Sequence, residues 1–308
     1  MKEEQINLDE TTLSIDLSDA TQAVKESRFE DALSLLKVLL KEHPNHIDIL
    51  YLSAVSTRFL KKFDDSSKHI EHLLFNAPDM GRAYQELGHL NRDMGNEEKA
   101  VMHYRQACEL NPALPSSWNY LYQYFQKIEN EPAASHALEQ IKKLQTLPGL
   151  LLFIEQILNE GRLGLAETKC RAFLKENPTH TYAMSLLAEI ANRFGYFDDA
   201  EFLLQKAVEF KPQDGDLRLK YASILRKKQK FAQTTEQVNI LCDQFPNNLN
   251  YQAQKASDVM QGGDHAKAIT MFDDILEKNP YNFSTLTSRG HAQKTLGSTD
   301  QAIKSYQS

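Results

Sequence analysis

Proline spacing divides this chain into segments of equal length. Three prolines in the first half lie 34 residues apart, and so do four prolines in the second half. They are Pro44, Pro78 and Pro112, then Pro178, Pro212, Pro246 and Pro280. The interval from Pro112 to Pro178 is 66 residues, which is one period of 34 and one of 32. A regular period of this length indicates stacked copies of one supersecondary unit rather than separate globular domains.

Two other positions recur in phase when each of these prolines is placed at repeat position 32. Position 20 is small in every repeat: Ala32, Ser66, Ala100, Ala134, Ala166, Ala200, Thr234, Ala268 and Ala302. Position 15 is glycine in five repeats: Gly95, Gly161, Gly195, Gly263 and Gly297. Small residues let two helices approach closely, a left-handed glycine ends a helix, and proline cannot continue one. Each repeat is therefore predicted to be a hairpin of helix A and helix B.

The predicted fold is all-α, a right-handed superhelical solenoid of antiparallel helix pairs with about eight full repeats and a truncated ninth. The repeats are expected at 13–46, 47–80, 81–114, 115–146, 147–180, 181–214, 215–248, 249–282 and from 283 onward. Residues 1–12 are expected to be a flexible N-terminus. Repeats 1–4 then occupy 13–146, the fourth being degenerate and two residues short, and repeats 5–9 occupy 147–308. Because the ninth repeat stops inside helix B without a polar cap, we expect a fragment of a longer protein, with a frayed natural terminus as the alternative.

Composition excludes several classes of function. The formal charge of −7 disfavours nonspecific nucleic-acid binding. No apolar run approaches the roughly 20 residues that span a bilayer, and the acidic start is neither a secretory signal nor a transit peptide. The three widely separated cysteines, Cys108, Cys170 and Cys242, predict core thiols rather than disulfides. A reducing cytoplasm is the simplest location, without membrane insertion.

No catalytic, cofactor or metal motif stands out in the sequence. Gly262-Gly263 lacks the Lys-Ser/Thr that completes a phosphate-binding loop. His69 and His72 lie one helical turn apart but have no evident third ligand, so a solvated helix face is expected there. The chain itself is therefore predicted to be non-catalytic and to hold no cofactor or metal.

A partner-binding groove is predicted on the A helices, which line the concave face of such a solenoid. Positions 12 and 13 carry a basic stripe: Arg58, Arg92, Lys127, Arg193, Arg226, Lys227 and Lys294. Positions 2, 5 and 9 add Arg82, His89, Asn119, Gln123, Tyr182 and His291. A basic stripe in an acidic protein favours an acidic protein or peptide partner. The alternative is that these cations only complement the helix macrodipole, by about 0.3–1 kcal/mol each.

The 34-residue register resembles that of tetratricopeptide-repeat proteins across nearly the whole chain. Several runs also look like the repeat region of bacterial proteins that carry a sulfotransferase domain after their repeats. They include Gly161-Arg162-Leu163, Cys170-Arg171-Ala172-Phe173-Leu174, Leu187-Ala188-Glu189-Ile190-Ala191, Asp198-Asp199-Ala200-Glu201 and Gly290-His291-Ala292-Gln293. That resemblance implies a parent that transfers sulfate from 3′-phosphoadenosine 5′-phosphosulfate. It carries no catalytic residue to this chain, which contains no strand–loop–helix phosphate cradle.

The expected function is a non-catalytic scaffold that binds peptide or protein partners in its concave groove. The resemblance makes it the N-terminal part of a larger sulfotransferase-type protein. The alternative is a stand-alone adaptor or assembly factor without an attached enzyme, and self-association is a further expectation for the partner.

Overall fold

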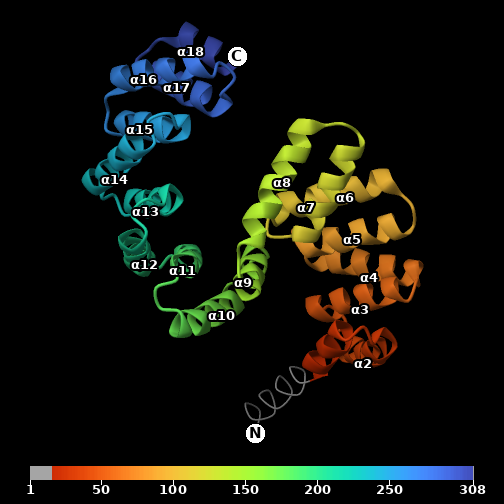
Figure 1. Ribbon diagram of the computed structural model, residues 1–308. Coiled ribbons are helices and arrows are strands. Elements are labelled where there is room, and N and C mark those ends of the chain that lie inside the picture. Colours follow the sequence, from red (N-terminus) through yellow and green to blue (C-terminus); the bar gives the residue numbers. More distant parts are fainter. Residues whose placement is uncertain (1–15, 308) are drawn as a thin grey trace. The chain divides into compact units, whose positions relative to one another are not determined.

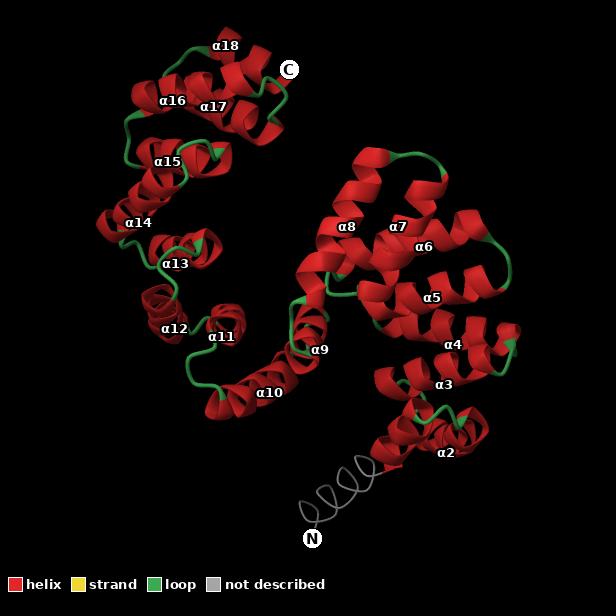
Figure 2. Cartoon of the chain, viewed as in Figure 1, coloured by secondary structure: helices red, strands yellow, loops and turns green. Residues whose placement is uncertain are grey.

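The computed structural model of the protein describes residues 16–307. Within this range the chain consists of helices joined by short turns and contains no strand (Figures 1 and 2). The expected flexible segment 1–12 lies outside the described residues. No helix of the described range is long and apolar enough to cross a membrane.

The chain divides into two compact units, Met1–Arg162 and Leu163–Ser308. After helical residues 16–25, the first unit contains α2 (Phe29–Glu42), α3 (Ile47–Phe59), α4 (Phe63–Asn76), α5 (Gly81–Asp93), α6 (Glu97–Leu110), α7 (Pro115–Lys127), α8 (Glu131–Gln145) and α9 (Gly149–Asn159). The second contains α10 (Leu163–Glu176), α11 (Thr181–Phe194), α12 (Phe197–Phe210), α13 (Gly215–Lys227), α14 (Phe231–Gln244), α15 (Leu249–Gln261), α16 (His265–Lys278), α17 (Phe283–Thr295) and α18 (Thr299–Gln307). The boundary follows Arg162, whereas the sequence placed one at 146/147, so α9 belongs to the first unit.

Consecutive helices pack as hairpins, and each hairpin packs on the next. Helix A contacts helix B of its own repeat in α3–α4, α5–α6 and α7–α8, and again in α11–α12, α13–α14, α15–α16 and α17–α18. Most B helices also pack on the next A helix, as α4 does on α5 and α12 on α13, and α8 with α9 is the exception. Successive A helices touch one another directly, from α3 to α5 to α7 and from α11 to α13. The all-α helical-repeat solenoid predicted from the proline period is confirmed within each unit.

All nine turns between helix A and helix B use the same left-handed backbone geometry at position 15. The five predicted glycines have φ between 75° and 94°. The four repeats without glycine place Ser27, Lys61, Glu129 and Gln229 there, with φ between 56° and 59°. In each turn the next N–H donates to the carbonyl five residues earlier, as Asn96 does to Asn91 at 2.8 Å and Lys230 to Leu225 at 2.9 Å. Formation of the turn therefore does not require glycine, although an L-residue is strained in this conformation.

Helix spacing within a hairpin depends on the small residue at position 8. A methyl group added to Gly88 would lie 2.8 Å from the Tyr104 ring, which fills position 24 of the facing helix and is fully buried. The ninth repeat uses the same pair, because a Cβ on Gly290 would lie 2.5 Å from the Tyr306 ring. A glycine at position 8 therefore makes room for a tyrosine at position 24.

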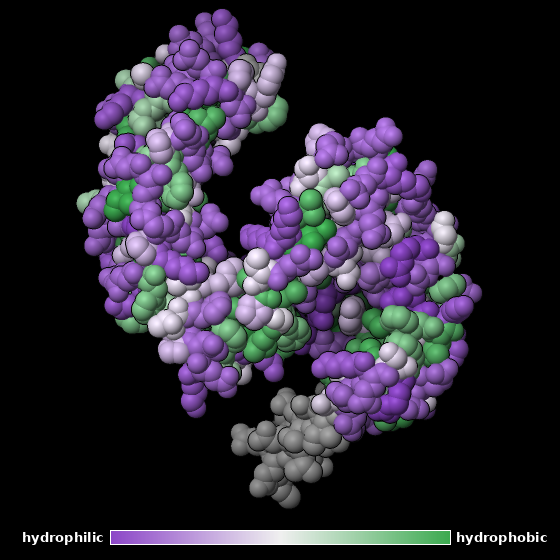
Figure 3. All heavy atoms as spheres, viewed as in Figure 1, coloured by the Kyte–Doolittle hydropathy of each residue, from purple (hydrophilic) through white to green (hydrophobic). Residues whose placement is uncertain are grey.

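The visible face of the molecule in Figure 3 is mostly hydrophilic, with only scattered apolar patches.

Candidate partner-binding site

The surface formed by the first helix of each hairpin, here called the A-helix face, carries all the predicted groove residues. In the first unit its centre is a buried ion-pair cluster rather than a free cation. Arg58 is 6% exposed and donates from Nε to Glu86 Oε1 at 2.5 Å and from Nη1 to Asp93 Oδ2 at 2.8 Å. Glu86 comes from α5, one repeat further along, and its side chain is 3% exposed. Arg58 therefore joins two repeats and is not available to a partner.

The end of α9 and the turn after it contact the start of α3 and α5 and the turn before α7; Figure 1 shows these helices in the first unit. Arg82 at the start of α5 holds Glu160 through two N–H···O contacts of 2.5 and 2.6 Å, and its guanidinium lies 5.0 Å from the centre of the Tyr51 ring. Arg162 pairs with Asp48 at the start of α3 through two contacts of 2.8 Å. The Glu160 side chain is only 3% exposed, so the predicted groove residue Arg82 already binds a carboxylate of its own chain.

Amide groups extend this contact to the start of α7. Asn111 Nδ2 donates to the Gln156 carbonyl at 3.0 Å, and Gln156 Nε2 donates to the Ala113 carbonyl at 2.7 Å. Asn159 Nδ2 donates to Asn111 Oδ1 at 3.2 Å, and Asn111 is fully buried. These amides, together with the Arg82–Glu160 and Arg162–Asp48 pairs, form what is here called the α9 seam. Sequence reasoning missed the seam because the α9 sequence reads as an ordinary helix A.

Two histidines that were predicted to line the groove form hydrogen bonds with the position-24 tyrosine of their own hairpin. His89 Nδ1 lies 2.6 Å from Tyr104 Oη, and His291 Nδ1 lies 3.2 Å from Tyr306 Oη. Burial, with the nearby charges of Arg58 and Arg92, lowers the pKa of His89 to about 4. His89 is therefore a neutral hydrogen-bonding group at neutral pH and contributes no positive charge to the face.

The remaining predicted residues of the first unit lie at the edge of the face. Arg92 donates to Asp93 at 2.7 Å, and Lys127 donates to Glu97 at 2.7 Å. Asn119 is exposed and donates to the Pro115 carbonyl at 2.8 Å, while Gln123 is exposed. The predicted groove cations of this unit are thus paired with acids of the same chain.

The second unit differs in its lysines. Its two predicted arginines are paired: Arg193 donates to Glu189 at 2.9 Å, and Arg226 donates to Asp258 at 2.8 Å. The exposed lysines of its A helices are Lys220, Lys227 and Lys294, whereas Lys255 in α15 is half-buried. Lys220 Nζ donates to Ser185 Oγ at 2.8 Å, and Lys227 Nζ donates to Asn192 Oδ1 at 2.7 Å. Among the described residues, none of these three lysines forms an ion pair with a carboxylate.

Both lysine contacts run from α13 back to α11, so they lie on the surface that two neighbouring A helices share. The predicted residue Tyr182 is half-buried at the start of α11. Sequence reasoning did not single out Lys220 because it considered only repeat positions 2, 5, 9, 12 and 13, and Lys220 occupies position 6. The positive charge of the predicted stripe is thus left uncompensated mainly in the second unit.

Cys108 and Cys170 pack in the core and are not activated as nucleophiles. Cys108 and Cys170 are buried, and burial raises the pKa of Cys108 to about 12 and of Cys170 to about 11. A nucleophilic cysteine needs the opposite shift, because the thiolate is the reactive form. In residues 16–307 no group of three His, Cys, Asp or Glu side chains is arranged to hold a metal ion. His72 instead lies 2.9 Å from the Asn45 side-chain oxygen.

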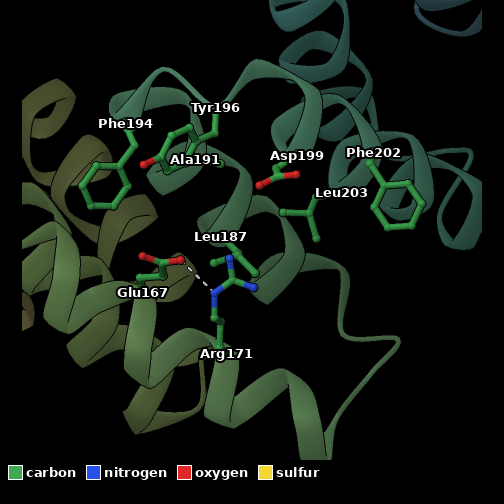
Figure 4. Close-up of a pocket in the computed structure, with 9 residues that line it drawn as sticks. All are labelled: Glu167, Arg171, Leu187, Ala191, Phe194, Tyr196, Asp199, Phe202 and Leu203. Carbon is green, nitrogen blue, oxygen red and sulfur yellow. Dashed lines mark hydrogen bonds and ion pairs between the residues drawn. The ribbon is translucent and has the colours of Figure 1, made fainter.

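Two of the hollows in the described structure lie between successive B helices and the A helix that joins them. One, of about 200 Å³, is bordered by α10, α11 and α12 and contains Glu167 paired with Arg171, with Phe194, Tyr196 and Phe202 at its rim (Figure 4). The other, of about 670 Å³, lies between α6 and α8. It is bordered by Trp118, which is half-buried against the core and donates to the Pro112 carbonyl at 2.8 Å. The first hollow is smaller than the roughly 300–1,000 Å³ typical of ligand pockets.

Comparison with known proteins matches the tetratricopeptide-repeat family at residues 81–114. None of the curated proteins compared with the chain matches it. Similar solved structures include the crystal structure of MamA (17% identity, TM-score 0.44, covering 50% of this chain and 90% of that chain). Another is the crystal structure of the APC/C hetero-tetramer Cut9-Hcn1 (16% identity, TM-score 0.42), which covers 90% of this chain, while this chain spans 55% of that chain.

The matched segment coincides with the third predicted repeat and contains α5, its left-handed turn and α6. The same turn geometry recurs in all nine A–B turns along the chain. Residues 81–114 are therefore a tetratricopeptide repeat, in an array of hairpins that share its turn geometry.

Proposed function

We propose that this chain is a non-catalytic scaffold that binds protein or peptide partners in the concave groove formed by its A-helix faces. One observation carries the proposal. Lys220 and Lys227 are exposed on the A-helix face of the second unit, and neutral oxygens hold both ammonium groups in place. Ammonium groups that have no carboxylate partner among residues 16–307, but are held at fixed positions, are suited to bind an incoming carboxylate.

The first unit supports the acidic character of the proposed partner. There, each groove cation that projects from an A helix meets a carboxylate, and Arg82 binds Glu160 in a two-pronged contact. These pairs are not available to a ligand, but they show that a cation on an A helix can hold a carboxylate at hydrogen-bond distance. The lysines of the second unit offer the same chemistry to another molecule.

Binding of an acidic peptide to the full chain tests this proposal. The probe is a fluorescein-labelled ten-residue Glu/Asp-rich peptide, with a Ser/Gln-rich peptide of equal length as the neutral control, measured by fluorescence anisotropy. We expect the variant Lys220→Glu/Lys227→Glu to lose at least about tenfold in affinity, since two attractions of up to about 1 kcal/mol each become repulsions. Binding should also weaken as salt is added.

A matched control separates groove charge from net charge. The variant Lys267→Glu/Lys278→Glu changes two exposed lysines of the B helix α16 and alters the net charge equally. Its affinity for the probe should fall only by the small amount that the change in net charge causes, and much less than that of Lys220→Glu/Lys227→Glu. Equal losses in both double variants would contradict a site on the A-helix face. Arg226 is a poor choice for this test, because its partner Asp258 is 10% exposed and would be left unpaired.

The resemblance of the runs around Gly161, Cys170 and Gly290 supports a finer proposal, that the chain is the N-terminal part of a larger sulfotransferase-type protein. The scaffold would then position an acceptor protein or a second subunit for the attached enzyme. The alternative is a stand-alone adaptor in the cytoplasm. Reading the coding sequence beyond Ser308 distinguishes them, because a sulfotransferase requires a strand–loop–helix phosphate cradle there and an adaptor does not.

A further inference from the structure

The contacts of the α9 seam are made by polar and charged side chains. Gln156 lies in the last turn of α9, and Glu160 directly follows the last residue of the helix. The buried residues Leu151, Ile154 and Leu158 follow the spacing of a helix A and lie on the other side of the helical wheel from Gln156. The end of α9 and the turn after it therefore contact the start of α3 and α5 and the turn before α7 through amide hydrogen bonds and ion pairs of defined geometry.

The receptor side of the seam is formed by residues that need a partner. Asn111 is fully buried, and its side-chain amide donates to the Gln156 carbonyl and accepts from Asn159 of α9. The Arg82 side chain is 15% exposed, and its ion-pair partner among the described residues is Glu160. Removal of α9 without replacement would leave Arg82 and Asp48 unpaired, which is costly for the buried arginine. Exchange for another helix with the same groups avoids that cost.

We propose that the A-helix face of the first unit is a receptor for a single helix that ends in a carboxylate and is followed by a left-handed turn and a cation, and that α9 with the turn after it is the resident ligand. This inference rests on the proposed scaffold function and adds the partner and the regulation of one of its faces. A partner helix carrying the glutamine, the carboxylate and the cation in the spacing of Gln156, Glu160 and Arg162 competes with α9 for Arg82, Asp48 and Asn111. Because α9 is tethered, it is present at a high effective concentration and keeps the face closed at rest.

The probe for this site is a labelled peptide with the sequence of residues 149–164. Its Leu151, Ile154 and Leu158 are changed to Ala for solubility, which leaves the seam side chains intact. The protein in every assay is the full chain. Glu160→Arg places a second guanidinium against Arg82 and opens the seam, so the probe should bind at least about tenfold tighter than to wild type. The exposed variant Glu139→Arg on α8 makes the same charge change away from the seam and should bind like wild type.

Charge exchange tests the recognition itself. In Arg82→Glu/Glu160→Arg the pair is re-formed within the chain in reverse, so the face should close again and reject the probe. A probe with Gln in place of Glu160 should bind the Glu160→Arg chain at least about fivefold more weakly than the original probe, because the charge-assisted contact with Arg82 is lost. Circular dichroism checks that each variant is folded.

Arg162→Asp is a milder variant, because it breaks only the partly exposed ion pair with Asp48 at the end of the seam. It replaces Glu160→Arg in the binding test if that variant does not fold. A folded opening variant that binds the probe no better than wild type or Glu139→Arg would overturn the proposal. Equal binding of the original and Gln-substituted probes would also overturn it. Acidic-peptide binding by the second unit, measured with Lys220→Glu/Lys227→Glu, is independent of these results, so failure of the α9 receptor and failure of the scaffold function are distinguishable.

Discussion

The left-handed residue at position 15 gives opposite predictions for two neighbouring turns of the second unit. Gly195 has φ 82°, and a Cβ built on it would meet no atom within 4 Å, so only backbone strain opposes a side chain. An L-residue in this conformation costs about 1–2 kcal/mol, part of which is offset because alanine narrows the unfolded ensemble by about 0.4–1 kcal/mol. Gly195→Ala should therefore destabilise the protein by about 1 kcal/mol. Gln229 has φ 57° in the equivalent turn, and Gln229→Gly should stabilise it by up to about 1 kcal/mol.

Urea unfolding followed by circular dichroism at 222 nm measures both changes in the full chain. Gly164→Ala is the matched control, because Gly164 is exposed in the first turn of α10 and a Cβ there also has no neighbour within 4 Å. Being helical, this site should gain stability, by up to about 0.5–1 kcal/mol, from the same chemical change. If Gly195→Ala proves as stable as wild type, or Gln229→Gly proves less stable, left-handed strain does not govern these turns.

Three further predictions follow from the first unit. Gly88→Ala should destabilise the protein by about 1–3 kcal/mol in urea unfolding, because the new methyl group would lie 2.8 Å from the Tyr104 ring; an unchanged midpoint would mean that the hairpin adapts freely. His89 has a folded-state pKa of about 4, below the unfolded value of about 6.5, so the unfolded chain binds the proton first and stability falls as pH drops through this window. Glutamine does not titrate, so between pH 6.5 and 4 the free energy of unfolding of His89→Gln should fall by up to about 3 kcal/mol less than that of the wild type. Identical pH profiles of unfolding for the variant and the wild type would refute this prediction. Arg58→Met should cost about 3–5 kcal/mol by leaving Glu86 buried without its cation, and Arg58→Met/Glu86→Leu should recover most of this loss in thermal unfolding.

The fold follows from the sequence because its determinants are local and repeat in register. Proline at position 32 and the small residue at position 20 each act within one hairpin, so nine weak signals in phase specify the array. The same local physics explains why the turns at Ser27 and Lys61 form without glycine. In these turns the hydrogen bonds and packing of the neighbouring residues offset the strain of a left-handed L-residue. A sequence pattern that searches for glycine alone therefore misses them.

The candidate site was less predictable because it depends on contacts between distant repeats. Arg58 and Arg226 looked like members of one basic stripe, yet each is bonded to an acid on the next A helix. The partner of Arg82 lies 78 residues further along the chain, in a helix whose sequence is that of an ordinary repeat. Periodicity places a residue on a face, but it does not say which side chain from elsewhere lies opposite it.

We propose that partners bind the A-helix face of the second unit through its lysines. Lysine acetylation footprinting with and without the acidic peptide, read out by mass spectrometry, locates the binding surface residue by residue. We expect the peptide to lower the reactivity of Lys220, Lys227 and Lys294 and to leave that of the B-helix residues Lys267 and Lys278 unchanged. Protection of Lys267 and Lys278 with continued full reactivity of Lys220 and Lys227 would contradict it.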